Sequence, residues 1–169
     1  MTVARTALIG LGLQRVYRDT VYWIDAHPHA IAVRIDESNV QLDRLLAARS
    51  ERRWIFITAC NPRSKRSSSW RNHARQHALL QSVRRSGKRW LNGLGEGLDN
   101  EWLPEPSIVV FGLGPHAGRR LGRQFGQFAV VAGRLGGRAQ LLWCDQVSTG
   151  HIVDPGLASS YAGTRSKRR

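Results

Sequence analysis

Four short apolar runs constrain the fold of this chain more than any other feature. They span residues 54–60, 107–111, 128–132 and 139–143. Each has the length of a strand, and the first three are rich in β-branched or aromatic residues. The first is almost uninterrupted, which is typical of a strand buried on both faces. The sequence therefore predicts a sheet, with residues 54–60 as its central strand.

Helix signals fall between these runs. Ser38, with Gln41 three residues later, resembles a capping box and predicts the start of a helix. Gly87 is placed to end a helix that begins near Ser69. A weak strand then leads into a glycine-rich stretch at residues 93–97 and an acidic loop. The predicted strands are 21–24, 30–35, 54–60, 89–92, 107–111, 128–132 and 139–143, and the predicted helices are 38–48, 69–86 and 115–125.

From residue 54 to residue 132 the predicted order is strand, helix, strand, strand, helix, strand. This order is the split βαβ pattern of ferredoxin-like domains. We therefore expect an α+β fold with a ferredoxin-like βαββαβ core and an added N-terminal β-hairpin and helix. Residues 14–147 are predicted to form a single domain, with a frayed N-terminus at 1–13 and a basic, disordered tail at 148–169.

The positive charge is concentrated in one part of the chain. The formal net charge is +14, and residues 51–90 contain eleven basic residues and one acidic residue. Such a block is typical of a surface that binds phosphates, although a run of charges is more often a solvated face. Three tryptophans at 54, 70 and 90 lie among these charges. They would suit the stacking of nucleic-acid bases or, equally, packing against the sheet.

The cysteine content indicates the redox compartment. Cys60 and Cys144 are the only cysteines, too few for a disulfide framework. We therefore expect a reduced, cytoplasmic protein. No stretch approaches the roughly 20 apolar residues that a membrane span requires, so a membrane partner is not expected.

Several short motifs occur in an order that resembles a known family. They are Tyr17, Thr20 and Tyr22, then residues 58–62, Asn72, residues 105–107 and residues 125–129. Over roughly residues 14–145 the chain is similar to the bacterial domain-of-unknown-function family three-two-nine-three. It differs from the family pattern at Cys60, where an aromatic residue is usual, and at Arg71, where an acidic residue is common. The resemblance implies no activity, because the family has none assigned.

The polar residues of these motifs predict a ligand site. On a ferredoxin-like frame, the end of the first core strand, the start of the first helix and the starts of the last two strands share one end of the sheet. Side chains at such positions can also act only as caps and turn-formers. The predicted ligand-binding residues are Asn61, Asn72, Glu105, Ser107 and Gln127, and the predicted phosphate-binding residues are Arg63, Lys65, Arg66, Arg71 and Arg75.

Three functions are compatible with this arrangement. The first is a non-enzymatic domain that binds an anionic partner, either a nucleic acid or a nucleotide. The second is an enzyme that acts on a phosphorylated small molecule, for which Glu105 is the candidate acid or base. The third is a protein-interaction adaptor whose basic face meets an acidic partner.

Two further patterns have simpler structural explanations. The glycine-rich turn at residues 112–118 superficially resembles a dinucleotide fingerprint, but no acidic residue ends the following strand to bind a ribose. His73 and His77 have the spacing of metal ligands on a helix, but no acidic third ligand lies nearby in sequence. We therefore expect neither a cofactor nor a metal.

Overall fold

The computed structural model of the chain describes residues 12–98 and 103–145. Residues 12–19 are helical, so the helix includes residues 12 and 13 of the segment expected to be frayed. Residues 1–11, the predicted tail at 148–169 and part of the acidic loop lie outside the described residues. The other elements are β1 (Val21–Asp25), β2 (Ala30–Val33), α2 (Val40–Ala48), β3 (Arg53–Ile57), the 3-10 helix η1 (Pro62–Ser64), α3 (Ser69–Arg85), β4 (Trp90–Glu96), β5 (Glu105–Phe111), α4 (Pro115–Gln124), β6 (Ala129–Arg134) and β7 (Gln140–Trp143).

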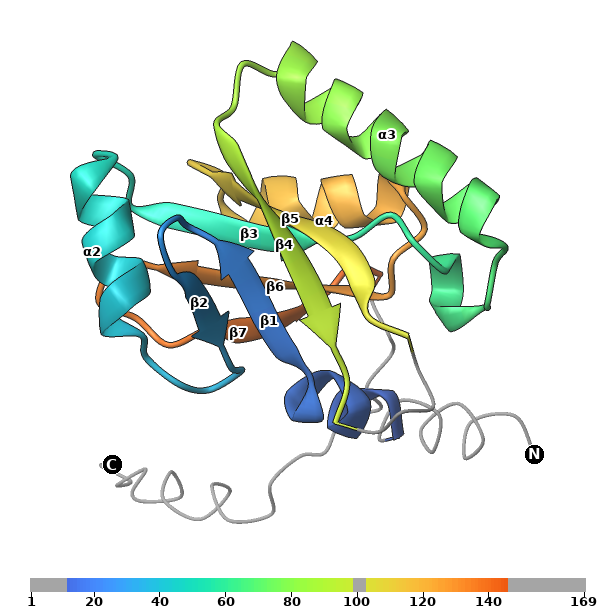
Figure 1. The fold of residues 1–169 in the computed structure, drawn as a ribbon, viewed down its shortest axis with the longest axis horizontal. Helices are drawn as coiled ribbons and strands as arrows, with labels where there is room; N and C mark the ends of the chain where they lie inside the picture. Colours follow the sequence, from blue (N-terminus) through green and yellow to red (C-terminus); the bar gives the residue numbers. More distant parts are fainter. Residues whose placement is uncertain (1–11, 99–102, 146–169) are drawn as a thin grey trace, which may run out of the picture.

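The strands form one curled antiparallel sheet in the order β2-β1-β4-β5-β3-β6-β7 (Figure 1). The chain is thus a mixed α+β protein, as the sequence predicts. Helix α3 connects β3 to β4, and α4 connects β5 to β6. Near the two edges, Ile35 and Ser38 form isolated bridges with Ala139 and Arg138, respectively. These bridges join the segment after β2 to the segment before β7, and they hold the sheet in its curl.

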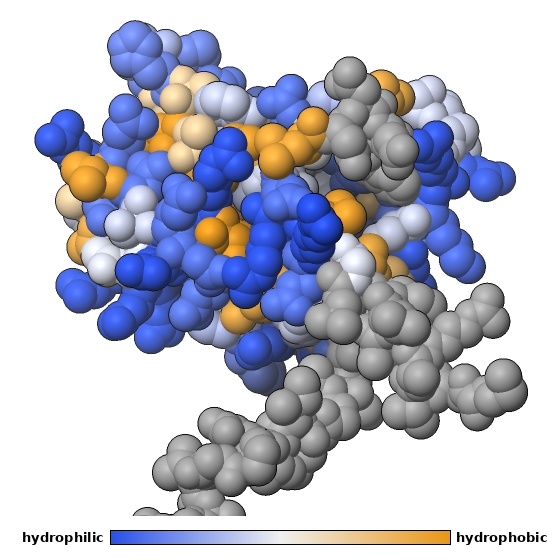
Figure 2. Space-filling model, turned by 90° about the horizontal axis from the view of Figure 1, so that it is seen from below, coloured by the Kyte–Doolittle hydropathy of each residue, from blue (hydrophilic) through white to orange (hydrophobic). Residues whose placement is uncertain are grey.

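The curl divides the core into two clusters, one on each face of the sheet. On one face, Leu79 and Val83 of α3 pack with strand residues such as Ile55. On the concave face, Leu42 and Leu46 of α2 pack with residues that include Tyr22, Trp54 and Phe56. Alternate residues of β3 therefore belong to opposite clusters, as expected for a strand buried on both faces. On the face shown in Figure 2, hydrophilic side chains predominate and hydrophobic ones form small groups between them.

Helix α2 does not begin with the predicted cap. The N-cap residue is Asn39, whose Oδ1 accepts a hydrogen bond from the Leu42 N–H at 2.9 Å. The Asn39 Nδ2 also donates to the Ala32 carbonyl oxygen at 2.7 Å, which ties the helix to β2. Ser38 is instead drawn into the bridge with Arg138. The prediction placed the cap one residue too early because this bridge is a long-range contact.

Strand β4 is longer than predicted, because it includes the glycines at 93 and 95. A Cβ atom at Gly93 would lie 2.6 Å from both the Phe56 ring and the Trp23 carbonyl oxygen. The glycine therefore allows a close approach between neighbouring parts of the sheet rather than a turn. Strand β3, conversely, ends at Ile57, three residues before the end of the apolar run.

Candidate functional site

Several strand ends meet beside η1 and the start of α3. Strand β3 ends four residues before Asn61, β5 begins at Glu105, and β6 begins two residues after Gln127. Because β3 runs antiparallel to both β5 and β6, its last residues lie beside the first residues of these two strands. We refer to this region as the site end of the sheet.

Asn61 is the centre of a hydrogen-bond network at the site end. Its Nδ2 donates to Glu105 Oε1 at 2.7 Å. Its Oδ1 accepts from Asn72 Nδ2 at 3.0 Å and from the Ser67 N–H at 2.9 Å. Its backbone N–H donates to Asn72 Oδ1 at 2.9 Å. Asn61 has a left-handed backbone (φ 43°), a conformation that asparagine tolerates better than most residues.

The other two predicted ligand-binding residues bind the backbone. Gln127 is buried, and its Nε2 donates to the Cys60 carbonyl oxygen at 2.9 Å. Ser107 is also buried, and its Oγ donates to the Glu105 carbonyl oxygen at 3.0 Å. Both hold the ends of strands in place. The structure thus brings all five residues to the site end, and three of them form a direct side-chain network.

Two cavities share Asn61 and Glu105 in their walls. The first, which we call the α3 cavity, has a volume of about 390 Å³. Its lining includes Arg66, Asn72 and His73, together with residues 103–106. The second, which we call the tyrosine cavity, has a volume of about 330 Å³ and opens from the concave side. Its described polar and aromatic lining residues include Tyr17, Thr20, Tyr22, Phe56, Thr58, Ser107 and Gln127.

Three residues of the family motifs that were not predicted as site residues also lie here: Tyr17, Thr20 and Tyr22. Helix 12–19 and the start of β1 bring them to the tyrosine cavity. The Tyr22 hydroxyl donates to the Tyr17 carbonyl oxygen at 2.8 Å. Burial raises the pKa of Tyr17 to about 12 and that of Tyr22 still further. Both phenols therefore remain protonated at neutral pH.

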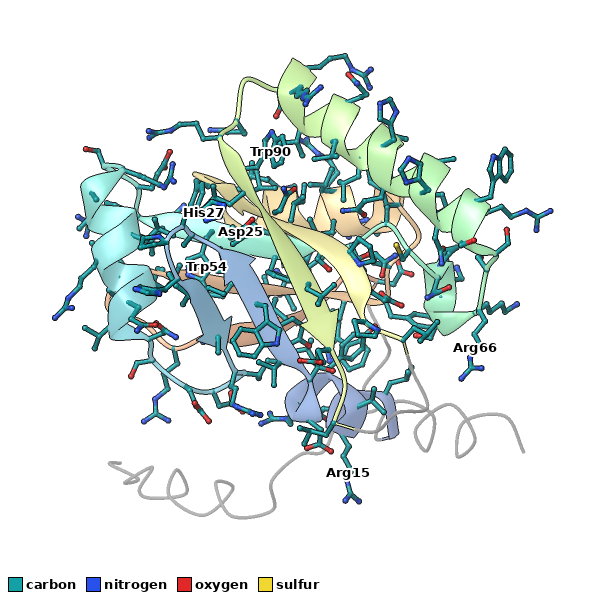
Figure 3. All side chains as sticks on the ribbon, in the orientation of Figure 1. Arg15, Asp25, His27, Trp54, Arg66 and Trp90 are labelled. Atoms are coloured by element: carbon teal, nitrogen blue, oxygen red, sulfur yellow. The ribbon has the colours of Figure 1, made fainter. Side chains whose placement is uncertain are left out.

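The predicted phosphate-binding residues have different environments. Arg66 lines the α3 cavity and extends outward from the loop after η1 (Figure 3). Lys65 and Arg71 are exposed. Arg63 lies 3.7 Å from Asp145 and above the Phe128 ring. Arg75 donates to the carbonyl oxygens of Ala59 at 3.0 Å and Phe125 at 2.8 Å, so its guanidinium group serves the backbone.

The three tryptophans of the basic block also differ. Trp54 is buried in the concave core, at 3% exposure. Trp90 is half-buried against the helix-side core, with the Arg84 guanidinium 5.8 Å from its ring (Figure 3). Trp70, in the first turn of α3, is 76% exposed. Of these three rings, only that of Trp70 is open to a partner.

The glycine-rich turn has a packing role. Gly112 has a positive φ of 72°, and a Cβ atom at Gly118 would lie 2.6 Å from the Ile55 side chain. Glycine therefore allows a tight turn and a close approach of α4 to the sheet. Among residues 12–98 and 103–145, no group of three or more His, Cys, Asp or Glu side chains could hold a metal ion. None of the helices described has the length and apolarity to cross a membrane.

Comparison with known proteins identifies a family for the segment that builds the site. A family described as "Protein of unknown function (DUF3293)" matches residues 57–130. This segment runs from the end of β3 into β6, and it contains all five predicted ligand-binding residues. No curated protein and no solved structure matches the chain. Residues 57–130 therefore match the DUF3293 family of proteins of unknown function, the family that the motifs predict.

Proposed function

We propose that this domain binds a small anionic molecule of nucleotide size at the Asn61–Glu105 pair. The observation that carries the proposal is that two cavities meet at this pair, each within the range of about 300–1,000 Å³ that is usual for small-molecule sites. Motif residues from segments up to 110 positions apart, such as Tyr17 and Gln127, line the tyrosine cavity. Such convergence is more economically explained by a ligand than by strand capping alone.

The tyrosine cavity suits the uncharged part of the ligand. Its walls combine aromatic and aliphatic side chains with a few hydroxyls and amides, and Glu105 is the only charged residue among its described lining residues. A nucleobase fits this chemistry because it offers a flat ring for Tyr22 and Phe56 and N–H donors for the Glu105 carboxylate.

The α3 cavity suits the anionic part. Arg66 and His73 are the basic residues in its wall, and Ser67, Ser69 and Asn72 supply neutral hydrogen-bonding groups. An arginine can bind a phosphate with two parallel hydrogen bonds. A nucleotide passing beside Glu105 would place its base in one cavity and its phosphate in the other.

Isothermal titration calorimetry with nucleoside monophosphates, nucleosides and inorganic phosphate tests this proposal. We expect at least one monophosphate to bind more tightly than either of its parts. Arg66→Ala should weaken the monophosphate about 10-fold and leave the nucleoside unchanged, because it removes one charge-assisted contact. Arg44→Ala is the matched control, since it removes an exposed arginine from α2. Equal losses in both variants, or no binding of any nucleotide, would contradict the proposal.

A second candidate function is an enzyme acting on a phosphorylated small molecule. It is favoured by one observation, that Glu105 is the only carboxylate among the described lining residues of either cavity. Asn61 holds this carboxylate in place, as a general acid or base requires. A Glu105→Gln variant should then retain binding and lose turnover, as followed by 31P NMR of the bound ligand. Unchanged turnover would exclude this role.

We further infer a ferredoxin-like core from β3 to β6, extended by the β1–β2 hairpin. The strand order β4-β5-β3-β6 and the packing of α3 and α4 residues in one core cluster support this inference. The two free, buried cysteines support a cytoplasmic location. Cell fractionation tests the location.

A further inference from the structure

The two long connecting helices carry positive charge without any negative charge. Helix α3 contains four arginines and α4 contains three, and neither helix contains an aspartate or a glutamate. Both helices pack on the same face of the sheet through the core cluster that includes Leu79 and Leu121. The charged side chains of these two helices are therefore all positive.

Part of this charge has a structural purpose. Arg75 binds the Ala59 and Phe125 carbonyl oxygens, Arg119 binds that of Trp143, and Arg123 binds that of Cys144. The remaining arginines, at 71, 84, 85 and 120, are exposed. None of these four forms an ion pair with any residue in the described parts of the chain. The Arg84 guanidinium also lies 5.8 Å from the Trp90 ring. The charge of the other three is left for solvent or for a partner.

The outer face of α3 combines this charge with an exposed aromatic ring. The inner face is defined by Gln76, Leu79 and Val83, which are buried. The opposite side carries Trp70 at 76% exposure, and residues 71, 74, 77, 78, 84 and 85 are exposed with it. Ala74 and Ala78 are exposed and place small side chains near the middle of this face. From residue 70 to residue 85 the face is about 22 Å long, at about 1.5 Å per residue.

We propose that the outer face of α3 binds single-stranded nucleic acid. Arg71, Arg84 and Arg85 contact phosphates, and the Trp70 indole stacks on a base. The small alanines let the strand approach between the two charged ends of the helix. This site lies on the outer side of α3 and does not require that a nucleotide enter the cavities.

The same face suits other polyanions less well. A helix that lies on a membrane inserts a broad apolar face, but the apolar face of α3 is buried in the core and its outer face offers one large hydrophobic residue, Trp70. An acidic protein would use the arginines but would gain little from an isolated indole. Stacking on a base uses both features, and for this reason we favour nucleic acid.

Fluorescence anisotropy with a labelled 12-nucleotide RNA of mixed sequence tests the proposal. We expect binding at low salt that weakens with salt, with a slope of about −0.7 in log K against log[salt] for each phosphate contact. Arg84→Gln with Arg85→Gln should reduce this slope by about 1.4. Trp70→Ala should weaken binding about 10-fold, and Trp70→Phe should restore most of the loss, because phenylalanine keeps a stacking surface.

The control is the double variant Arg44→Gln with Arg138→Gln, which removes the same amount of charge elsewhere. Both residues are exposed: Arg44 is in α2, and Arg138 pairs with Ser38 just before α2. An equal effect of this pair would overturn the proposal, as would an absence of RNA binding at low salt. Polyglutamate and anionic vesicles are the competing ligands. If either binds as tightly as RNA and its affinity does not depend on Trp70, the face is a protein-binding or membrane-binding surface instead. Trp70→Ala should leave the binding of nucleoside monophosphates unchanged, because Trp70 lines neither cavity. A failure of the RNA proposal is therefore distinguishable from a failure of the nucleotide proposal.

Discussion

At the scale of single residues, the arginines of the basic block show how one side chain serves different purposes. Arg75 lies within the fold and joins the end of β3 to the end of α4 through two carbonyl oxygens. Arg71, one turn earlier on α3, is exposed. Since the carbonyls of Ala59 and Phe125 depend on Arg75, its charge stabilises the backbone around the site.

We predict that Arg75→Ala lowers the free energy of unfolding by roughly 2–3 kcal/mol, because it removes two hydrogen bonds from a charged donor. The comparison variant Arg71→Ala should change it by less than about 0.5 kcal/mol, as is usual at an exposed position. Guanidinium unfolding monitored by circular dichroism measures both values. Similar values for the two variants would show that the contacts of Arg75 contribute nothing to stability.

At the scale of elements, the start of α2 depends on a contact with a strand. Asn39 caps the helix and also donates to the Ala32 carbonyl oxygen on β2. One side chain thus sets both the first turn of α2 and its position against the sheet. Leu42 and Leu46 are thereby directed into the concave core.

We predict that Asn39→Ala destabilises the protein by about 1–2 kcal/mol, because both the cap and the tie to β2 are lost. Ser38→Ala is its neighbour control and should cost less than about 0.5 kcal/mol, because no cap depends on the Ser38 side chain. Urea unfolding of the two variants measures the difference. A larger loss of stability for Ser38→Ala than for Asn39→Ala would indicate that Ser38 is the cap, as the sequence alone predicts.

At the scale of the whole molecule, ionisable groups are buried on both sides of the sheet. Cys144 belongs to the helix-side core, and Tyr17 and Tyr22 line the concave side. Burial raises the pKa of Cys144 from 9.0 to about 11 and that of Tyr17 from 10.0 to about 12. The folded state thus favours the neutral form of each group, whereas the unfolded chain ionises at lower pH.

We predict that the protein loses stability as the pH rises above about 9. Below this pH the groups are neutral in both states and contribute nothing to the pH dependence. Above it the unfolded state releases protons first, so the free energy of unfolding falls until the folded-state pKa values are reached. For Cys144 the loss is roughly 2 kcal/mol at about pH 11.

Urea midpoints between pH 7 and pH 11 measure this loss, and tyrosinate absorbance follows the phenols. Cys144→Ala should show a smaller loss than the unmodified chain over the same range. A midpoint that stays constant up to pH 11 would mean that these groups ionise as easily in the folded state as in the unfolded one.

The sequence by itself determined the type of most elements, but it did not predict the helix at residues 12–19 or η1. Apolar runs of strand length indicate β3, β5, β6 and β7, and helical periodicity indicates α3, because burial of apolar side chains dominates the choice of local structure. The motifs also identified the family and the set of polar residues that meet at the site end. These features are local, or they need only the order of the elements.

Only the tertiary structure decided features that depend on contacts between distant segments. The Ser38–Arg138 bridge moved the start of α2, and the close approach of Phe56 to Gly93 extended β4. The curl of the sheet formed the tyrosine cavity and brought Tyr17 to it. Contacts with Ala59 and Phe125 distinguish Arg75 from Arg71, which lies on the same helix and faces solvent. In each case, the favoured conformation of a residue depends on a contact with a segment far away in the sequence. A local sequence pattern does not indicate such a contact.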